Sequence, residues 1–246
     1  GPMILGLGVL QVNTLFDGLI ASYPTVVGPT IFGVDYPLDV GAMAAVTFAQ
    51  RLYQFPFGVF GIAIATAIFP ALARLASGPD GPFVETIRRG MRLVMFIGLP
   101  ASTGIILVRE PMTRVILEGG YFTADDTDRV AFILLGYAPA IWAYSMVHVF
   151  TRAFYARGES MTPVRIALLM VGANLALNVT LIWTPLREAG LAWSTAICAV
   201  MQAGLLGWTL RRRIGMLLDR DVLASWGRTG LAVLVMTTAV AGVTMA

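Results

Sequence analysis

The chain has 246 residues, of which 57% are hydrophobic and 13% charged, and its mean hydropathy is +0.78. An ordinary soluble domain of this length does not accommodate so many apolar residues, so the composition excludes that class and predicts a membrane protein. The net charge of +3 is small, and the single cysteine, Cys198, excludes a disulfide framework and a cysteine metal site.

Apolar segments long enough to cross a bilayer occur along the whole chain. A helix needs about 20 such residues to span about 30 Å of hydrocarbon, and windows of that length predict seven helices. We therefore expect an all-α integral membrane protein with about seven transmembrane helices. The predicted spans are Ile4–Tyr23, Ala42–Leu75, Thr86–Val108, Asp126–Phe154, Thr162–Thr184, Ala189–Leu210 and Trp226–Met245.

Polar residues interrupt the first and fifth of these spans. Asn13 and Asp17 are four residues apart and share one helix face, and Asn174 and Asn178 repeat that spacing. A carboxylate at bilayer depth needs a cation or a hydrogen-bond donor, and such residues commonly mark ion or substrate pathways. Two interpretations stay open: these side chains bind a hard cation, or they hydrogen-bond across helices and hold the bundle together.

Two connections have enough sequence to carry structure of their own. Pro24–Asp39 is rich in proline, glycine and valine and predicts an external loop or a re-entrant hairpin. Met112–Leu117 is expected to form a short helix at the membrane interface. After it, Thr123 or Asp125 is expected to cap the next helix.

The second span contains an arginine, Arg51, near its start. An ionised side chain at bilayer depth costs about 2.5–3.5 kcal/mol on insertion scales, so such a residue normally faces a cavity or a partner. Pro56 lacks a backbone donor and clashes with the preceding turn, so the helix should bend just after Arg51. Arg51 is therefore the leading candidate for a functional residue.

The arginines predict the orientation in the membrane. Twelve of the 17 lie at the ends of, or after, the second, fourth and sixth spans, and four lie in the alternate connections. Because positive residues concentrate on the cytoplasmic side, the arginine-rich end and the N-terminus are predicted to be cytoplasmic. We interpret Arg211–Arg213 as a topogenic anchor and not as a nucleic-acid site.

The sequence lacks the motifs of catalysis, such as HExxH, GxSxG or a phosphate-binding glycine loop, so we expect a protein that is not an enzyme. His148 is the only histidine and lies late in the fourth span. It is interpreted as a polar residue that lines a cavity or the interface, with proton relay as the alternative.

Three segments carry a recognisable pattern. Arg51–Arg74 contains R-L-Y-Q-F-P-F-G-V-F-G-I-A and then F-P-A-L-A-R, Leu117–Thr123 reads L-E-G-G-Y-F-T, and Arg152–Pro163 reads R-A-F-Y-A-R-G-E-S-M-T-P. In this order they resemble the eighth helix, the external F-x-x-G-x-F-T segment and the R-A-F-Y-A-R-G-D-T-x-T-P junction of the MurJ/MviN lipid II flippase family.

The resemblance implies a fold and a function. The family belongs to the multidrug/oligosaccharidyl-lipid/polysaccharide (MOP) exporter superfamily and moves the undecaprenyl-linked peptidoglycan precursor, lipid II, across the bacterial cytoplasmic membrane by alternating access. It implies that residues 1–213 form the second six-helix lobe and residues 214–246 a linker and one further helix. The first lobe would be missing, so we expect a fragment of a longer protein.

The resemblance also implies site residues. Arg51 matches the cavity arginine that engages the pyrophosphate of the precursor, and we predict Gln54 and His148 as further substrate-binding residues. Some members bind sodium, and the matching positions here are Asp17, Asn174, Asn178 and Thr195. Asn178 stands where sodium-binding members have aspartate, which lowers the charge of the site. Apart from sodium, we expect no cofactor.

Other functions are consistent with the same features. Another exporter of the superfamily, for polysaccharide-linked lipids or drugs, would share the fold. A membrane-embedded lipid-modifying enzyme would need an acid/base pair that we do not find. A non-transporting scaffold is the remaining alternative, because half of a transporter is absent. The expected partners are lipid II, membrane lipids and the missing first lobe of the full-length protein, and nucleic acid is not expected.

Overall fold

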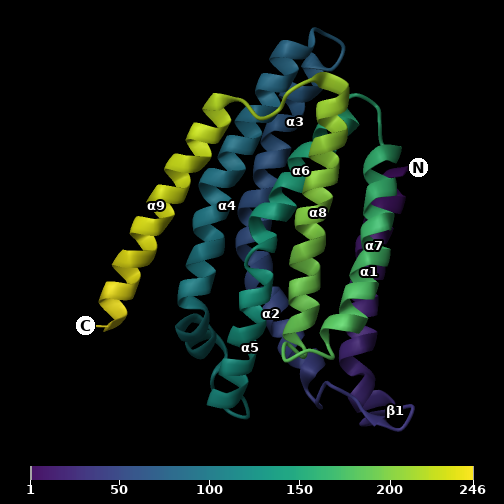
Figure 1. Cartoon of the computed structure of the whole chain (residues 1–246), viewed down its shortest axis with the longest axis vertical. Coiled ribbons are helices and arrows are strands. Elements are labelled where there is room, and N and C mark those ends of the chain that lie inside the picture. Colours follow the sequence, from purple (N-terminus) through teal and green to yellow (C-terminus); the bar gives the residue numbers. More distant parts are fainter. Residues whose placement is uncertain (1, 246) are drawn as a thin grey trace.

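A computed structural model describes the backbone of residues 2–245 and the side-chain surroundings of residues 13–242. Long helices lie side by side in a bundle, with one small β-hairpin at one end (Figure 1). The predicted all-α class is therefore confirmed. The elements are α1 (Pro2–Val26), β1 (Thr30–Ile31), β2 (Val34–Asp35), α2 (Ala42–Pro56), the π-helical segment η1 (Phe57–Ile62), α3 (Ala63–Leu75), α4 (Asp80–Leu117), α5 (Ala124–Tyr137), α6 (Ala140–Ala156), α7 (Met161–Leu181), α8 (Ala189–Ile214) and α9 (Arg220–Met245).

Six helical segments within the described residues are long and apolar enough to cross a membrane, and they match the second to seventh predicted spans. The first predicted span, Ile4–Tyr23, falls in α1, but the side chains of residues 1–12 lie outside the description. The six segments are Ala42–Leu75, Asp80–Leu117, Ala124–Ala156, Met161–Leu181, Ala189–Ile214 and Arg220–Gly242.

The helix that carries Arg51 changes its hydrogen-bonding pattern where the sequence predicted a bend. Pro56 ends α2, and the next six residues form the π-helical segment η1 before α3 begins at Ala63. Proline has no N–H to donate to the preceding turn, so one hydrogen bond of the helical ladder is missing at Pro56. π-Helical turns inside α-helices are rare and occur frequently at functional sites.

One helix is longer than predicted. Met112–Leu117 does not form a separate helix at the interface; it is the last part of α4, which continues past Pro111. The physical reason is local: Arg114 forms ion pairs one turn away in both directions, with Glu110 at 3.0 Å and with Glu118 at 3.4 Å. Pairs at this spacing stabilise a helix, and they continue α4 through the break that proline suggests.

The predicted cap of the following helix is confirmed. Thr123 accepts a hydrogen bond from the backbone N–H of Asp126, and the Asp126 carboxylate accepts one from the Thr123 backbone at 2.9 Å, which completes a capping box. The connection Pro24–Asp39 forms a hairpin at the end of the bundle, where β1 and β2 pair antiparallel. Whether this hairpin is an external loop or re-enters the membrane stays a prediction.

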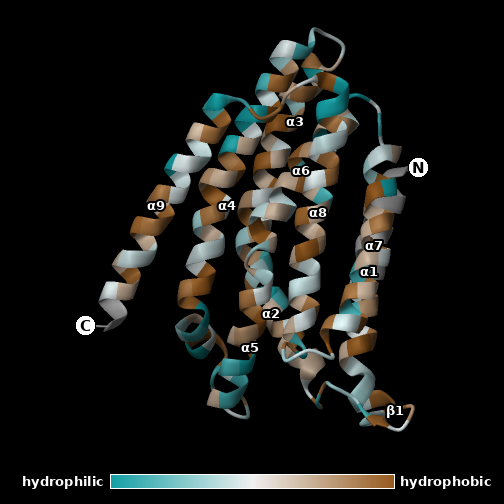
Figure 2. Cartoon of the chain, in the orientation of Figure 1, coloured by the Kyte–Doolittle hydropathy of each residue, from teal (hydrophilic) through white to brown (hydrophobic). Residues whose placement is uncertain are grey.

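Two large apolar clusters and one small cluster fill the bundle. The first large cluster joins α3, α4, α6, α8 and the start of α9, and the second joins α1, α2, α5 and the start of α8. The small cluster consists of alanines of α6 and α8. The windows of α5–α6 and α8 are 72% and 61% buried, whereas those of α2–α3 and α9 are only 17% buried. Hydrophobic residues cover the middle of the bundle and hydrophilic ones gather at its ends (Figure 2). The outer helices thus present the apolar surface that lipid or another membrane domain covers.

Ion pairs tie the connections together at each end. At the arginine-rich end Arg157 pairs with Asp80, and Arg88 pairs with Asp219 at 2.9 Å. The connections after α3, α6 and α8 meet there, and the β-hairpin lies at the other end (Figure 1). Connections rich and poor in arginine thus lie at opposite ends of the bundle, in agreement with the predicted arginine partition. The orientation in the membrane itself stays a prediction. The proposed division after residue 213 also stays a prediction, because α9 packs back on α4.

Candidate functional site

A cluster of polar side chains lies buried between α1, α7 and α8. Asn178 Nδ2 donates a hydrogen bond to Asp17 Oδ1 at 2.6 Å and another to Asn174 Oδ1 at 3.0 Å. Asp17 is 4% exposed, and the two asparagines are 1% exposed or less. The structure therefore brings together three of the four residues predicted for an ion site, across the predicted helices.

Ser194 is the member of this cluster that sequence reasoning missed. Its hydroxyl is fully buried, donates to Asn178 Oδ1 and accepts a hydrogen bond from Asn174 Nδ2 at 3.3 Å. Thr195, the predicted fourth residue, is also buried, but its hydroxyl donates to the Leu191 carbonyl of its own helix at 2.9 Å. The sequence did contain a signal for Ser194: the connection between α7 and α8 is short, so residues near the end of α7 and the start of α8 are expected to be neighbours.

Close backbone packing sets this geometry. Gly190, at the start of α8, lies so near the end of α7 that an added Cβ would sit 2.9 Å from the backbone of Leu181. Asn174 and Asn178 are one turn apart on α7, so both amides point toward α8 and α1. In a membrane, small residues at helix contacts permit this approach, and the polar side chains then hydrogen-bond across the interface.

The residues of the cluster fit a hard cation in their chemistry. The oxygens come from one carboxylate, two amides and hydroxyls, which are the ligands that hard cations prefer. Asn13 lies one turn from Asp17, and its buried Oδ1 accepts no hydrogen bond within the described residues. The amide oxygens of Asn174 and Asn178 now accept hydrogen bonds, so a cation would have to displace the donors.

Arg51 lies on the exposed face of α2, and no hydrogen bond or ion pair to it occurs within the described part of the chain. The opposite face of α2, with Ala49 and Tyr53, is buried in the bundle. Gln54 is also exposed, one turn after Arg51. Gln50, the residue before Arg51, points inward and donates to the Tyr137 hydroxyl at 3.0 Å. Arg51 and Gln54 therefore share the surface that this chain leaves open.

His148 takes a different position. It is half-buried on α6, and its ring stacks on Phe57 at a centroid distance of 5.5 Å. Phe57 is the first residue of η1, one turn after Gln54, so His148 packs directly against the irregular segment of the Arg51 helix. That the three residues form one binding surface stays a prediction.

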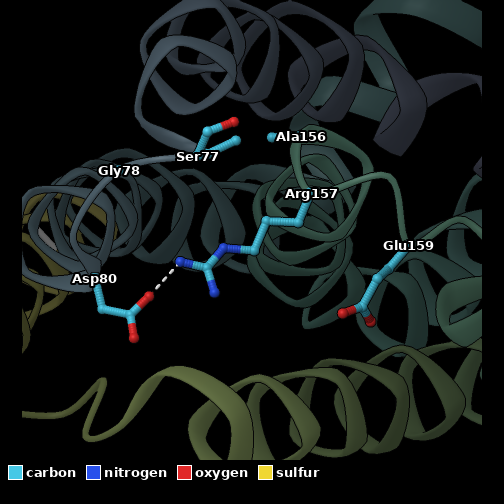
Figure 3. A pocket seen from close by; sticks show the side chains of 7 residues that line it. Ser77, Gly78, Asp80, Ala156, Arg157 and Glu159 are labelled. Atoms are coloured by element: carbon cyan, nitrogen blue, oxygen red, sulfur yellow. Dashed lines mark hydrogen bonds and ion pairs between the residues drawn. The ribbon is translucent and has the colours of Figure 1, made fainter.

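A polar pocket lies at the arginine-rich end, where the connections after α3 and α6 meet (Figure 3). Arg157 points across it to Asp80, and Glu159 lies on the other side. The Arg157 guanidinium also stacks over the Phe83 ring at 4.3 Å. Because the arginine is paired and stacked, this pocket is a junction that fixes two connections.

Comparison with known proteins decides the family. The family model described as "Lipid II flippase MurJ" matches residues 1–246. The chain belongs to the MurJ family of lipid II flippases. The resemblance stated from the three sequence segments is thereby confirmed. MurJ proteins are transporters and not enzymes, and this chain is a multi-pass member.

Relatives in the MurJ family cover most of this chain. A "Probable lipid II flippase MurJ" of Vibrio cholerae is 33% identical over 207 residues, which are 83% of this chain and 36% of that protein. The corresponding protein of Haemophilus influenzae is 30% identical over 212 residues, which are 83% of this chain and 38% of that protein. The chain thus spans less than half the length of these MurJ relatives.

Solved structures show the same fold. "Lipid II flippase MurJ, inward closed conformation" superposes with a TM-score of 0.76 at 21% identity, over 94% of this chain and 45% of that one. An outward-facing multidrug transporter of the MATE family gives a TM-score of 0.71 at 16% identity, over 97% of this chain and 52% of that one. The fold is therefore that of one half of a MOP-superfamily transporter, as the sequence predicted.

Proposed function

We propose that this chain is the second lobe of a lipid II flippase in the bacterial cytoplasmic membrane. The full-length protein would move the undecaprenyl-diphosphate-linked precursor of peptidoglycan from the inner to the outer leaflet by alternating access. The match of the MurJ family model over residues 1–246 is the observation that carries this proposal. The sparsely buried outer helices support it, because they offer an apolar face on which the first lobe of the full-length protein would pack.

Arg51 is the proposed contact to the diphosphate. Its guanidinium is exposed and unpaired within the described residues, so its charge is available to an anionic headgroup. A planar guanidinium makes two parallel charge-assisted hydrogen bonds to phosphate oxygens, whereas an ammonium acts as a point charge. Gln54, exposed one turn away, adds an amide donor for the same headgroup.

His148 is proposed to act at the edge of this site. Its stacking on Phe57 links α6 to η1, and Arg152 lies one turn further along α6, over the ring of Phe69 at 5.4 Å. An imidazole held in this way donates or accepts one hydrogen bond with little reorganisation. We therefore assign it a polar contact to the precursor and no role in covalent chemistry.

The buried cluster is proposed as a weak sodium site. Asp17, Asn174 and Asn178, together with the hydroxyls of Ser194 and Thr195, would hold the ion. A bound sodium ion would neutralise the Asp17 charge, which now depends on the Asn178 amide. In the absence of the ion, hydrogen bonds of Asp17, Asn174, Asn178 and Ser194 keep α1, α7 and α8 together.

A second candidate function is multidrug or polysaccharide-lipid export. The structural similarity to the MATE transporter supports this candidate, because that similarity is almost as high as the similarity to MurJ. Fold alone does not specify a substrate. The sequence relatives favour the flippase, since the proteins of Vibrio cholerae and Haemophilus influenzae are both described as MurJ.

Complementation tests the proposal. The gene for the full-length protein is expressed in a bacterium whose own lipid II flippase is depleted, and growth and lipid II translocation are measured. Restored growth with restored translocation supports the flippase. Normal membrane expression without rescue, together with export of a drug or another lipid-linked sugar, would reverse the choice between the two candidates.

A further inference from the structure

The β-hairpin at the arginine-poor end presents an aromatic ring that the described chain leaves uncovered. Phe32 is 101% exposed and has a φ of 50°, and Gly33 follows with a φ of 82°. Two successive residues with positive φ form a type I′ turn, whose first position favours Asn, Asp or Gly. A bulky residue in this conformation is a backbone outlier. Neither the strain nor the exposure of the ring is compensated by a contact within the described residues.

The two faces of the hairpin differ in polarity. Thr30 pairs with Asp35 across the strands, and Ile31 pairs with Val34. Because paired residues point to the same side of a two-stranded sheet, one face carries the two apolar side chains and the other carries the two polar ones. Val34 is 56% exposed and Ile31 is half-buried, so the bundle covers this apolar face only in part. An amphipathic element of this kind suits the plane between lipid and water.

The hairpin follows an exposed apolar face of α1 in the chain. Leu15, Leu19 and Val26 are four and seven residues apart and share one helix face, and they are 59%, 58% and 77% exposed. This stripe runs toward the end of the helix, and Val27, directly after α1, is also exposed. The hairpin therefore comes directly after a predicted membrane-spanning helix with an exposed apolar face.

An aromatic group lies at the base of the hairpin. Tyr36 stacks on Tyr23 at 4.5 Å and contacts Trp183 edge-on at 6.4 Å between ring centroids. Its hydroxyl also donates to the Ile20 carbonyl at 3.0 Å. Tyrosine and tryptophan are enriched where the headgroups meet the hydrocarbon, so this group suits the interface between lipid and water.

We propose that the hairpin, residues 30–35, is an interfacial anchor that inserts Phe32, Ile31 and Val34 into the phospholipid leaflet at the arginine-poor end. The occupant of the exposed apolar residues is lipid, since the hairpin follows an exposed apolar stripe of α1 and starts beside the Tyr23, Tyr36 and Trp183 group. Thr30 and Asp35 face water. The anchor fixes the end of α1, and with it the helix that carries Asp17, relative to the bilayer surface.

Fluorescence from a label on the hairpin tests the anchor directly. Phe32→Cys is introduced into the full-length protein with Cys198→Ala, labelled with an environment-sensitive NBD dye, and reconstituted into phosphatidylethanolamine/phosphatidylglycerol vesicles. We expect blue-shifted emission that lipids carrying a doxyl group quench several-fold more strongly than they quench the control label at Asp35→Cys. Quenching by aqueous iodide equal to that of the control would overturn the proposal. Protection from both quenchers would also overturn it, because protein would then cover the ring.

A second variant separates anchoring from folding. Phe32→Asn places a residue that the type I′ turn favours at the strained position, so thermal stability in detergent should stay unchanged or rise. In the same protein a label at Ile31→Cys should lose at least half of its lipid quenching when Phe32→Asn is added. A fall in detergent stability, or undiminished lipid quenching, would show that the ring is not a membrane anchor.

Discussion

Asn178 donates a hydrogen bond of 2.6 Å to the Asp17 carboxylate, and this contact joins α7 to α1 in the interior of the bundle. Both side chains are buried, at 0% and 4% exposure. A carboxylate at such a place is strongly unfavourable unless a donor or a cation meets it. The hydrogen bond from the Asn178 amide therefore stabilises the buried Asp17 carboxylate. Substitution of Asn178 should lower the stability of the protein, whereas substitution of Asp17 should change its response to sodium.

Removal of the Asn178 amide should destabilise the protein. Asn178→Ala leaves the Asp17 carboxylate and the Asn174 carbonyl without their shared donor, and a buried group left unpaired costs about 1–3 kcal/mol. Thermal unfolding of the purified full-length protein in potassium buffer measures the loss. Val179→Ala, at the exposed neighbour on α7, is the matched control and should stay within about 0.5 kcal/mol of wild type. Equal melting temperatures for the two variants would contradict this account.

Sodium should stabilise the protein through Asp17. If sodium binds the folded state alone, stabilisation grows with the logarithm of its concentration and reaches about 2.7 kcal/mol at 100 times the dissociation constant. Asp17→Asn keeps the size of the side chain and removes its charge, so the difference between sodium and potassium should vanish. Asp35→Asn, an exposed carboxylate on the hairpin, should keep the difference. If wild type responds equally to both ions, the cluster is a hydrogen-bonded junction and no ion site.

Much of this cluster could be predicted from sequence, and the reasons are physical. The i,i+4 spacing of Asn174 and Asn178 and the depth of Asp17 required partners across helices, and the structure supplies them. Ser194 was missed because a serine hydroxyl in a helix can satisfy itself on its own backbone, so its presence alone indicates no partner. Both Thr195 and Ser194 bond the Leu191 carbonyl of their own helix, and only the packed structure shows that Ser194 also contacts Asn174 and Asn178.

Other features depended on contacts that a hydropathy pattern does not contain. The end of α4 was placed too early because Arg109, Glu110 and Pro111 together resemble a helix boundary, whereas the pairs of Arg114 continue the helix. The hairpin register was not predictable, since Phe32 occupies a turn position that its residue type disfavours. The long spans were predictable because hydrocarbon thickness fixes their length.

The arginine partition gives a topology that labelling can check. Because arginine-rich connections remain in the cytoplasm, Ser77 should be cytoplasmic and Tyr121 external. Both positions are exposed at opposite ends of the bundle, so Ser77→Cys and Tyr121→Cys in a Cys198→Ala background should be reactive. A membrane-impermeant maleimide added to intact spheroplasts should label only Tyr121→Cys, and permeabilisation should expose Ser77→Cys. Labelling of Ser77→Cys before permeabilisation would invert the orientation.

Arg51 gives the sharpest test of the proposed transport site. Its guanidinium makes no hydrogen bond or ion pair within the described residues, so Arg51→Ala removes no contact among them and should leave the free energy of unfolding within about 0.5 kcal/mol of wild type. Lipid exposure would leave five donors unsatisfied, so we expect the side chain to face the interior of the full-length transporter.

Transport and folding should therefore separate at this position. Arg51→Ala should abolish complementation of a flippase-depleted strain, and Arg51→Lys should restore it only in part, because lysine keeps the charge but loses the two parallel hydrogen bonds to phosphate. Arg74→Ala, an exposed arginine at the end of α3, is the matched control and should complement fully. Membrane expression of each variant is measured alongside growth. Full growth with Arg51→Ala at normal expression would show that the precursor is held elsewhere. If Arg74→Ala lost complementation equally, the defect would come from removing any exposed arginine and not from a substrate contact of Arg51.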